Sequence, residues 1–398
     1  MAFVSDTVGE RTSGAGDVWV AIGLSVGAAV ALGFSRFAYA LLLPPMRASL
    51  HWTYTQAGGP NTANALGYTF GSIAAAWISR RAGIKATFIG TLAIGGLVLL
   101  LTGCTSDYAA LMTLRFVGGF ATAVTFVVGT SLAAGIAPRG TPRRAALLLA
   151  VYITGVGSGI VISGLVIPPV LAALGAAGWP VGWAWLGVLS LLGLAPAWAA
   201  TRHVPAQSAP DAAILPWRQV AFLWPTFANY TLFAAGYVSY MTFVILLIRN
   251  GGGAAYAATF WVVLGLASVL GTLLWGPVIA AVGMRRASSV VAIVVLIGTL
   301  PVLLSPTVTA AFLSAVLFGA SFMAGPTAVT VIVRKLVAPQ MWTAALAALT
   351  VVFAIGQAVG PVLSGIVSDA TGSVAAGLWV SPVLLIAAAL FAPLQKLE

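Results

Sequence analysis

The stretch YITGVGSGIVISG at residues 152–164 is rich in glycine and carries no charge. It aligns without a gap with FAIGQAVGPVLSG at residues 353–365, an offset of 201. Three further segments match at offsets of 201 or 200: Gly118 with Gly319, Ala137 and Pro138 with Ala338 and Pro339, and Gly83 and Lys85 with Gly283 and Arg285. Four registers that agree within one residue predict two duplicated halves.

The composition indicates a polytopic membrane protein. Of 398 residues, 61% are apolar and only 6% are charged, and the mean hydropathy is +1.07. A soluble domain carries about 25% charged residues, so a water-soluble enzyme, a disordered protein and a nucleic-acid binder are excluded despite the net charge of +11. The single Cys104, with His51 and His203 as the two histidines, excludes an internal disulfide and predicts no metal site.

The apolar runs predict an all-α fold of 12 transmembrane helices, because roughly 20 residues cross a bilayer and the chain offers about 33 for each span with its loop. The expected helices are residues 18–42, 54–78, 84–104, 109–136, 145–171, 180–200, 218–248, 255–281, 287–304, 308–333, 343–367 and 373–393. Together with the duplication, they predict two pseudo-symmetric six-helix bundles at 18–200 and 218–394. A tail at 1–17 and a linker at 201–217 complete the division.

The basic residues predict the orientation. With the N-terminus inside, 14 of the 16 Lys and Arg outside the helices fall on the cytoplasmic side, and Arg47 and Arg249 fall outside. The 14 are Arg11, Arg80, Arg81, Lys85, Arg139, Arg143, Arg144, Arg202, Arg218, Arg285, Arg286, Arg334, Lys335 and Lys396. We expect a multi-pass protein of the inner (plasma) membrane with both termini and the linker cytoplasmic.

Several motifs resemble the major facilitator superfamily. RRAGIK at 80–85 resembles its loop after helix 2, and RFVGG at 115–119 resembles its helix 4 pattern. GFSRFAY at 33–39, NTANALGY at 61–68, Gly236-Tyr237 and FAIGQ at 353–357 resemble the YbfB/YjiJ branch of that superfamily. The resemblance implies the major facilitator fold, rocking of the two halves around a midplane site, and a monomer. Arg80 stands where the loop acid is expected and Ile84 where its arginine is expected, so the usual gate ion pair is not implied here.

Two arginines fall inside predicted helices. Arg36 lies about 8 residues, roughly 12 Å, from the outer end of helix 1, and its insertion costs ~2.5–3.5 kcal/mol. We expect it to contact an anionic substrate; the alternative is that it caps backbone carbonyls or binds Asp107. Arg115 lies about 6 residues inside helix 4, roughly 9 Å, where both snorkelling and convergence with Arg36 on one anion are open to it.

Three other groups are candidates for substrate contact. On helix 2, Asn61, Asn64, Tyr68 and Ser72 share a face, which suits either a binding surface or polar contacts between helices. On helix 7, Tyr230, Phe233, Tyr237 and Tyr240 share a face and suit either a cavity wall or packing. Tyr237 matches Arg36 at the offset of 201, and Gln357 lies on a face with Thr350 and Phe353.

Glycines and basic loop residues are the candidates for gating. The glycines of helices 5 and 11 allow close backbone approach, with gating as a consequence of packing. The gating candidates are Arg80, Arg81, Gly83, Lys85, Gly159, Gly360 and Pro361.

These features favour a secondary active transporter for a small organic anion, with alternating access and no cofactor. The alternative is a proton-coupled efflux antiporter, although Ile160 follows Gly159 where the antiporter signature has proline. A membrane enzyme would lack a general base, and a two-half repeat argues against a channel. No Walker loop, GxGxxG or GxSxG occurs. Because the predicted spans hold no buried Asp, Glu or His, a coupled proton would travel on the substrate, on water, or on Asp107 or Asp369.

The orientation is open to a direct test. An alkaline phosphatase fused at Asp211 should be inactive, because the linker is expected on the side that carries the basic residues, whereas a fusion at Arg249 should be active. Activity of the Asp211 fusion would contradict the twelve-span orientation.

Overall fold

The computed structural model describes residues 14–137, 141–205, 215–338 and 341–396, apart from the side chains of Pro142, Met284, Arg285 and Thr343. All regular elements in these residues are helices. In the first half they are α1 (Gly14–Ala28), η1 (Ala29–Phe37), α2 (Tyr39–Leu50), α3 (Tyr54–Ala82), α4 (Ile84–Thr102), α5 (Tyr108–Ala134), α6 (Pro142–Leu174), η2 (Gly175–Gly178), α7 (Trp179–Leu192) and α8 (Leu194–His203). In the second half they are α9 (Trp217–Phe222), α10 (Trp224–Asn250), η3 (Gly253–Ala255), α11 (Ala257–Val282), α12 (Met284–Leu304), α13 (Val308–Ser321), α14 (Ala324–Leu336), α15 (Trp342–Thr371), α16 (Val374–Leu378), α17 (Val380–Phe391) and η5 (Ala392–Leu394).

The described helices agree with twelve crossings. Ten runs are long and apolar enough to span a membrane. One of them, Arg143–His203, has 61 residues, about 90 Å of helix, and it turns at Gly175, where φ is +63°. It therefore supplies two crossings, α6 and α7–α8. The 29-residue α3 is also long enough to cross, and it carries the polar residues Asn61, Thr62 and Asn64.

The first crossing is longer than the sequence predicts. We expected it to end near residue 42, but α1, η1 and α2 continue to Leu50 with Pro44 and Pro45 inside α2. Transmembrane helices tolerate such prolines because neighbouring groups satisfy the freed carbonyls. Arg36 consequently lies 14 residues, about 21 Å, from that end, and it sits in the π-helical segment η1.

Local geometry repeats between the halves. Gly83 (φ 83°, ψ 143°) and Gly283 (φ 81°, ψ 148°) both end a helix and begin the next in a conformation that favours glycine. Asp107 and Thr307 each cap a helix by accepting a bond from the backbone nitrogen three residues on, Ala110 and Ala310. These pairs are 200 residues apart, as the duplication predicts.

The first crossing (α1, η1 and α2) and α10 are related by a different register in their packing. Gly159 of α6 packs against the Ala29 carbonyl, and its counterpart Gly360 packs against the Ala235 carbonyl, 206 residues from Ala29. Gly155 and Gly356 show the same offset, against Ser25 and Thr231. The gapless match of Arg36 with Tyr237 was therefore wrong as a structural equivalence: by packing, the counterpart of Arg36 is Thr242.

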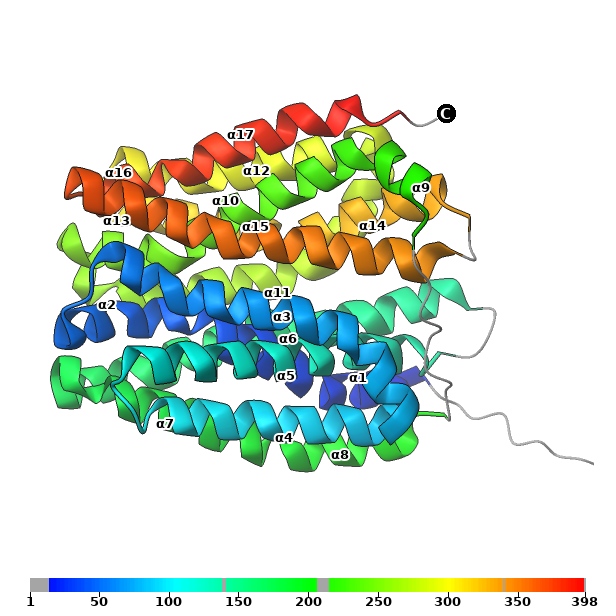
Figure 1. Cartoon of the computed structure of the whole chain (residues 1–398), viewed down its shortest axis with the longest axis horizontal. Coiled ribbons are helices and arrows are strands. Elements are labelled where there is room, and N and C mark those ends of the chain that lie inside the picture. The colour runs from blue at the N-terminus through cyan, green and yellow to red at the C-terminus, as the bar shows by residue number, and fades with distance from the viewer. Residues whose placement is uncertain (1–13, 138–140, 206–214, 339–340, 397–398) are drawn as a thin grey trace, which may run out of the picture.

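The two halves lie side by side, the first below and the second above in Figure 1. We call the end that carries Leu50, Tyr54 and Thr371 the distal end, on the left of Figure 1; the described chain begins and ends at the opposite, proximal end. Glycines allow close contact between the halves. A Cβ atom on Gly58 would lie 2.8 Å from the Pro361 carbonyl oxygen, and one on Gly157 would lie 2.8 Å from that of Gly265.

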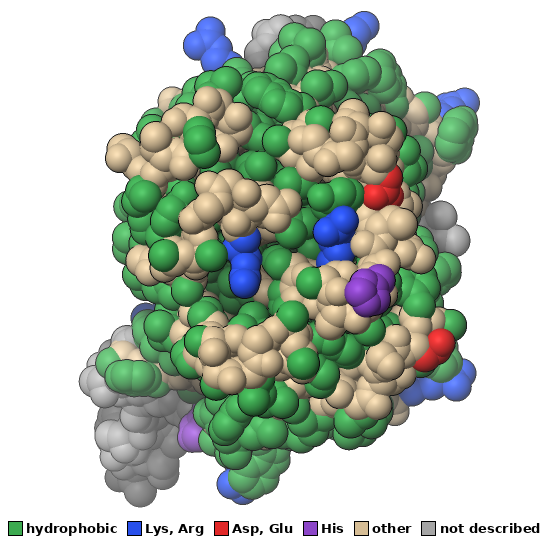
Figure 2. Space-filling model, turned by 90° about the vertical axis from the view of Figure 1, so that its left-hand side faces the viewer, with side chains coloured by type: hydrophobic (Ala, Val, Ile, Leu, Met, Phe, Trp, Pro, Cys, Tyr) green, Lys and Arg blue, Asp and Glu red, His purple; other side chains and the backbone are tan. Residues whose placement is uncertain are grey.

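Hydrogen bonds also join the halves. Thr62 donates to the Ala358 carbonyl (2.6 Å), and Trp261 donates to Ser163 (3.1 Å). At the distal end, the Asp369 carboxylate of α15 accepts from the backbone nitrogens of Tyr54 (2.7 Å) and Thr55 (2.8 Å), the first residues of α3. A carboxylate at a helix N-terminus satisfies free N–H groups and the helix dipole. Figure 2 shows the distal face, where charged side chains are few and separate among hydrophobic and uncharged atoms.

Asp369 is predicted to hold the distal ends of the halves together. Asp369→Asn removes the charge and one acceptor, so the amides of Tyr54 and Thr55 should exchange with deuterium about threefold to tenfold faster in hydrogen-exchange mass spectrometry. Asp107→Asn is the matched control, because Asp107 caps α5 within one half and its loss should leave exchange at the start of α3 unchanged. Equal exchange in wild type and Asp369→Asn would contradict this role.

Candidate functional site

Arg36 lies at the centre of a buried polar cluster. Its side chain is 3% exposed. Nε donates to Oδ1 of Asn64 (3.2 Å), Nη1 donates to Oε1 of Gln357, and the guanidinium lies over the Tyr68 ring at 4.7 Å. Nη2 has no acceptor in hydrogen-bonding geometry: the Tyr237 hydroxyl lies close enough to interact with the guanidinium, but the bond that it accepts in good geometry comes from Gln357. The cation is thus held by neutral groups with one nitrogen left over.

Gln357 connects Arg36 to the second half. Its Oε1 accepts from Arg36, and its Nε2 donates to the Tyr237 hydroxyl. These three residues come from η1, α15 and α10. The structure therefore brings together five of the residues predicted from sequence: Arg36, Asn64, Tyr68, Tyr237 and Gln357.

No described carboxylate balances the Arg36 charge. The described acids are Asp17, Asp107 and Asp369, and all three lie at helix ends. Asp17 pairs with Arg144 (2.7 Å), Asp107 caps α5, and Asp369 caps α3. The acceptors on Arg36 are side-chain amides, neither the backbone carbonyls nor the Asp107 carboxylate of the alternative interpretation.

Arg115 is placed differently, although it is equally buried at 3% exposure. Nη1 donates to the Ser35 carbonyl, Nη2 to Oδ1 of Asn61 (3.4 Å) and Nε to the Pro60 carbonyl (3.5 Å). The guanidinium also lies over the rings of Trp183 and Tyr39, at 5.1 and 5.4 Å. All three nitrogens are occupied inside the first half, and the side chain does not snorkel to the distal surface.

The two arginine environments share the polar face of α3. Asn64 Nδ2 donates to the Ser35 hydroxyl and to the Arg115 carbonyl, both at 3.3 Å. Asn61 Nδ2 donates across the interface to Oγ1 of Thr242 (2.8 Å). Sequence reasoning missed Ser35 and Thr242. In the 206-residue register that the helix packing reveals, Thr242 is the counterpart of Arg36.

Aromatic rings from the second half surround Tyr237. Tyr237 lies 5.8 Å from Phe353 with nearly parallel rings (24°), and Phe353 stacks on Tyr230 at 4.4 Å. Phe233 and Phe322 lie 5.7 and 5.8 Å from Tyr237. Tyr240 is turned away: its hydroxyl bonds to Ser314 (2.6 Å) and its ring packs on Phe318 (4.3 Å). The structure thus places Tyr230 in the aromatic group and Tyr240 outside it.

The gating candidates lie in two regions. At the proximal end, Arg80 and Arg81 end α3 and Lys85 Nζ donates to the Val204 carbonyl (2.7 Å), with Gly83 between the helices. Gly159 and Gly360 pack within their own halves, whereas Pro361 faces Gly58 across the interface. Pro138, Arg139, Asp211 and Pro339 lie outside the described residues.

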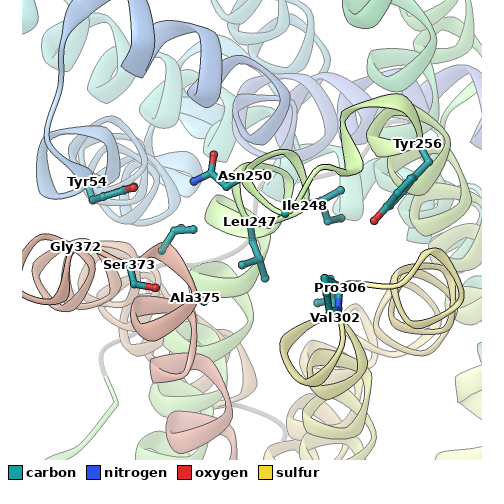
Figure 3. A pocket seen from close by; sticks show the side chains of 12 residues that line it. Tyr54, Leu247, Ile248, Asn250, Tyr256, Val302, Pro306, Gly372, Ser373 and Ala375 are labelled. Carbon is teal, nitrogen blue, oxygen red and sulfur yellow. The ribbon is translucent and has the colours of Figure 1, made fainter.

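Two cavities open at the distal end. One of about 290 Å³ gathers side chains from α3 and the second half around its opening, as Figure 3 shows with Tyr54, Asn250 and Tyr256. The other, of about 280 Å³, lies between the halves and includes Leu41, Ile167 and Arg249. Neither is lined by Arg36 or Gln357, so these side chains pack against each other in this conformation. No group of metal-ligating side chains occurs within the described residues.

Comparison with solved structures gives the same fold. A bacterial homolog to the human lysosomal transporter Spinster, in an inward-facing and occupied conformation, matches with a TM-score of 0.74 at 15% identity, over 95% of this chain and 96% of that one. The nucleoside transporter NupG matches with a TM-score of 0.69 at 13% identity, over 94% and 97%. The major facilitator transporter FucP, in the outward conformation, matches with 0.62 at 15%, over 95% and 98%. A comparison with curated proteins gave no match.

The match to a family is more specific. Residues 28–392 match the family described as "Uncharacterised MFS-type transporter YbfB". This confirms the resemblance found in the motifs and the major facilitator fold of two six-helix bundles. The chain belongs to this YbfB-like family of major facilitator transporters and is a secondary transporter of the membrane.

Proposed function

We propose that this transporter moves a small organic anion across the inner (plasma) membrane by alternating access, and that Arg36 binds the anion. The observation that carries the proposal is the buried guanidinium of Arg36, which has neutral partners and one unbonded nitrogen. A charge in the membrane interior is expensive, and arginine cannot lose its proton at working pH. An anion would supply the missing charge and the missing acceptor.

Arg115 provides the internal comparison. It is buried to the same degree, yet every nitrogen has an acceptor and two rings face the guanidinium. This is how the fold accommodates an arginine whose role is to hold helices together. Arg36 has one nitrogen without an acceptor, which favours a ligand as its remaining partner.

The position of Arg36 suits alternating access. It sits in the first half, and its hydrogen bond to Gln357 reaches the second half. We infer that the bundles at 18–200 and 218–394 rock about this contact, with the segment at 201–217 as their linker. The glycine contacts of Gly58 with Pro361 and of Gly157 with Gly265 form the surface along which the bundles separate.

The basic helix ends support the proposed orientation. Arg80, Arg81, Lys85, Arg202, Arg334 and Lys335 lie at proximal helix ends, whereas Arg47 and Arg249 lie at distal ones. By the positive-inside tendency, the proximal end is cytoplasmic and the distal end is outside.

Arg36 is predicted to contribute more to anion affinity than Tyr237. A thermal-shift screen of organic anions on the purified protein identifies a ligand, and titration then gives its Kd. Arg36→Gln should weaken binding about 100-fold because it removes a charged pair of donors, Arg36→Lys about tenfold because it loses the planar fork, and Tyr237→Phe about fivefold. Wild-type affinity in a folded Arg36→Gln protein would contradict this prediction and indicate a structural role for Arg36.

Gln357 supplies a second, opposite test. Gln357→Glu places a carboxylate of the same shape against Arg36. It should weaken anion binding about 100-fold, and the melting temperature should be equal to that of the wild type or higher. Gln357→Met is the matched control, since it removes the competing oxygen and should tighten anion binding. Undiminished binding in Gln357→Glu would mean that the anion does not use this edge of Arg36.

A further inference from the structure

We propose that the transported anion is an aromatic monocarboxylate: its carboxylate displaces Gln357 from Arg36, and its ring enters the aromatic group around Tyr237 and Phe353. This inference rests on the proposed function and specifies its substrate class. Three features of the cluster carry it: the free edge of the guanidinium, the number of available charges and the rings beyond that edge.

The free edge of Arg36 has the shape of a carboxylate site. Nε is fixed by Asn64, and Tyr68 covers one face of the guanidinium. The remaining edge consists of Nη1, which Gln357 occupies, and Nη2, which has no partner. Two parallel donors on one planar edge match the two oxygens of a carboxylate. The Gln357 amide oxygen therefore occupies one of the two positions that the carboxylate would take.

Of the two buried guanidiniums that the structure describes, only Arg36 has a nitrogen without an acceptor. Each nitrogen of Arg115 already donates one hydrogen bond, to Pro60, Ser35 or Asn61. Every other basic side chain that the structure describes lies near a helix end or in a loop. A second carboxylate on the substrate would be buried without a partner, at a cost of several kcal/mol if it stayed ionised. The site therefore favours one negative charge.

Rings lie next to the free edge. Gln357 bonds both Arg36 and Tyr237, so a ligand that replaces it enters between the guanidinium and the Tyr237 ring. The Phe353 ring lies 5.8 Å from the Tyr237 ring, and the Tyr230 ring lies 4.4 Å from that of Phe353; both pairs are nearly parallel. Phe353 is only partly buried, whereas Tyr237 is 3% exposed, so the group is most open at Phe353.

This arrangement discriminates between ring types. A flat aromatic ring adds to such a group by an offset stack on the partly exposed Phe353 ring, which gives favourable contact beyond the burial of apolar area. A saturated ring of the same size is thicker and has no π face to stack. Aliphatic and aromatic carboxylates thus share the contact with Arg36 and differ in the contact with Phe353.

The test uses matched pairs of probes on the purified full-length protein. Isothermal titration gives Kd for benzoate against cyclohexanecarboxylate, for 3-phenylpropionate against 3-cyclohexylpropionate, and for 4-methylbenzoate against the dianion terephthalate. We expect the aromatic member of each ring pair to bind about threefold to tenfold more tightly, and terephthalate to bind at least about tenfold more weakly than 4-methylbenzoate.

Variants assign the preference to the rings. Phe353→Leu should bring the members of each ring pair to within about twofold of each other, and Tyr230→Leu provides a second variant if the first is unstable. Phe312→Leu is the control, because Phe312 pairs with Tyr256 at the distal end and its loss should keep the preference.

The outcomes separate this inference from the proposed function. Equal affinity for aromatic and saturated rings, a preference that persists in Phe353→Leu, or tighter binding of terephthalate would overturn the aromatic monocarboxylate while Arg36-dependent binding upholds the anion. Carboxylate binding that Arg36→Gln leaves intact, or no binding by any of the carboxylates, would overturn the proposed function as well.

Discussion

The arrangement of this protein depends on one constraint: the fold holds two buried guanidiniums, Arg36 and Arg115, on neutral hydrogen-bond acceptors. Inside a membrane, backbone groups must be satisfied by helices and by their neighbours, and charges must find partners. The chain follows the first rule in detail. Pro60 has no N–H to offer the Gln56 carbonyl one turn earlier, and the Tyr108 hydroxyl donates to that carbonyl instead (3.1 Å). Nine buried side-chain atoms in the described residues lack a hydrogen-bond partner, and most of them are serine hydroxyls. Nη2 of Arg36 differs from the hydroxyls because it belongs to a cation inside the membrane.

The two intramembrane arginines differ in their hydrogen-bond partners, and this difference separates their expected roles. Their exposure is the same, and both contact the polar face of α3. Arg115 takes two backbone carbonyls, which the fold supplies permanently, and the Asn61 side chain, and so fastens η1, α3 and α5. Arg36 takes amide oxygens from flexible side chains, one of which belongs to the other half. Permanent acceptors suit a structural contact. Exchangeable ones suit a contact that a substrate replaces.

Sequence reasoning located the helices, the duplication and most of the Arg36 cluster for identifiable reasons. Long apolar runs are strong signals, and the spacing of Asn64 and Tyr68 fixes a common helix face whatever the tertiary structure. The direction of Arg115 could not be predicted, because a side chain in that position can reach either the surface or inner carbonyls, and only the approach of Ser35 and Pro60 decides. Tyr240 shares a face with Tyr237 by spacing, yet its hydroxyl is hydrogen-bonded to Ser314 of a neighbouring helix, outside the Arg36 cluster. The match of Arg36 with Tyr237 failed because a gapless alignment does not register which glycine meets which carbonyl.

The contacts between the halves share a chemical property that bears on gating. Asp369 meets backbone amides, Thr62 meets a carbonyl, and Arg36 meets an amide side chain. None of these contacts pairs two charged side chains. Breaking a buried ion pair leaves an uncompensated charge and costs about 3–5 kcal/mol, whereas a hydrogen bond contributes about 1 kcal/mol when both partners are neutral and about 1.5–3 kcal/mol when one is charged. These contacts between the described parts of the two halves therefore separate at lower cost than ion pairs would. In the proposed function, the charge at Arg36 is the one that the substrate balances, because no carboxylate in the described part of the chain lies beside it.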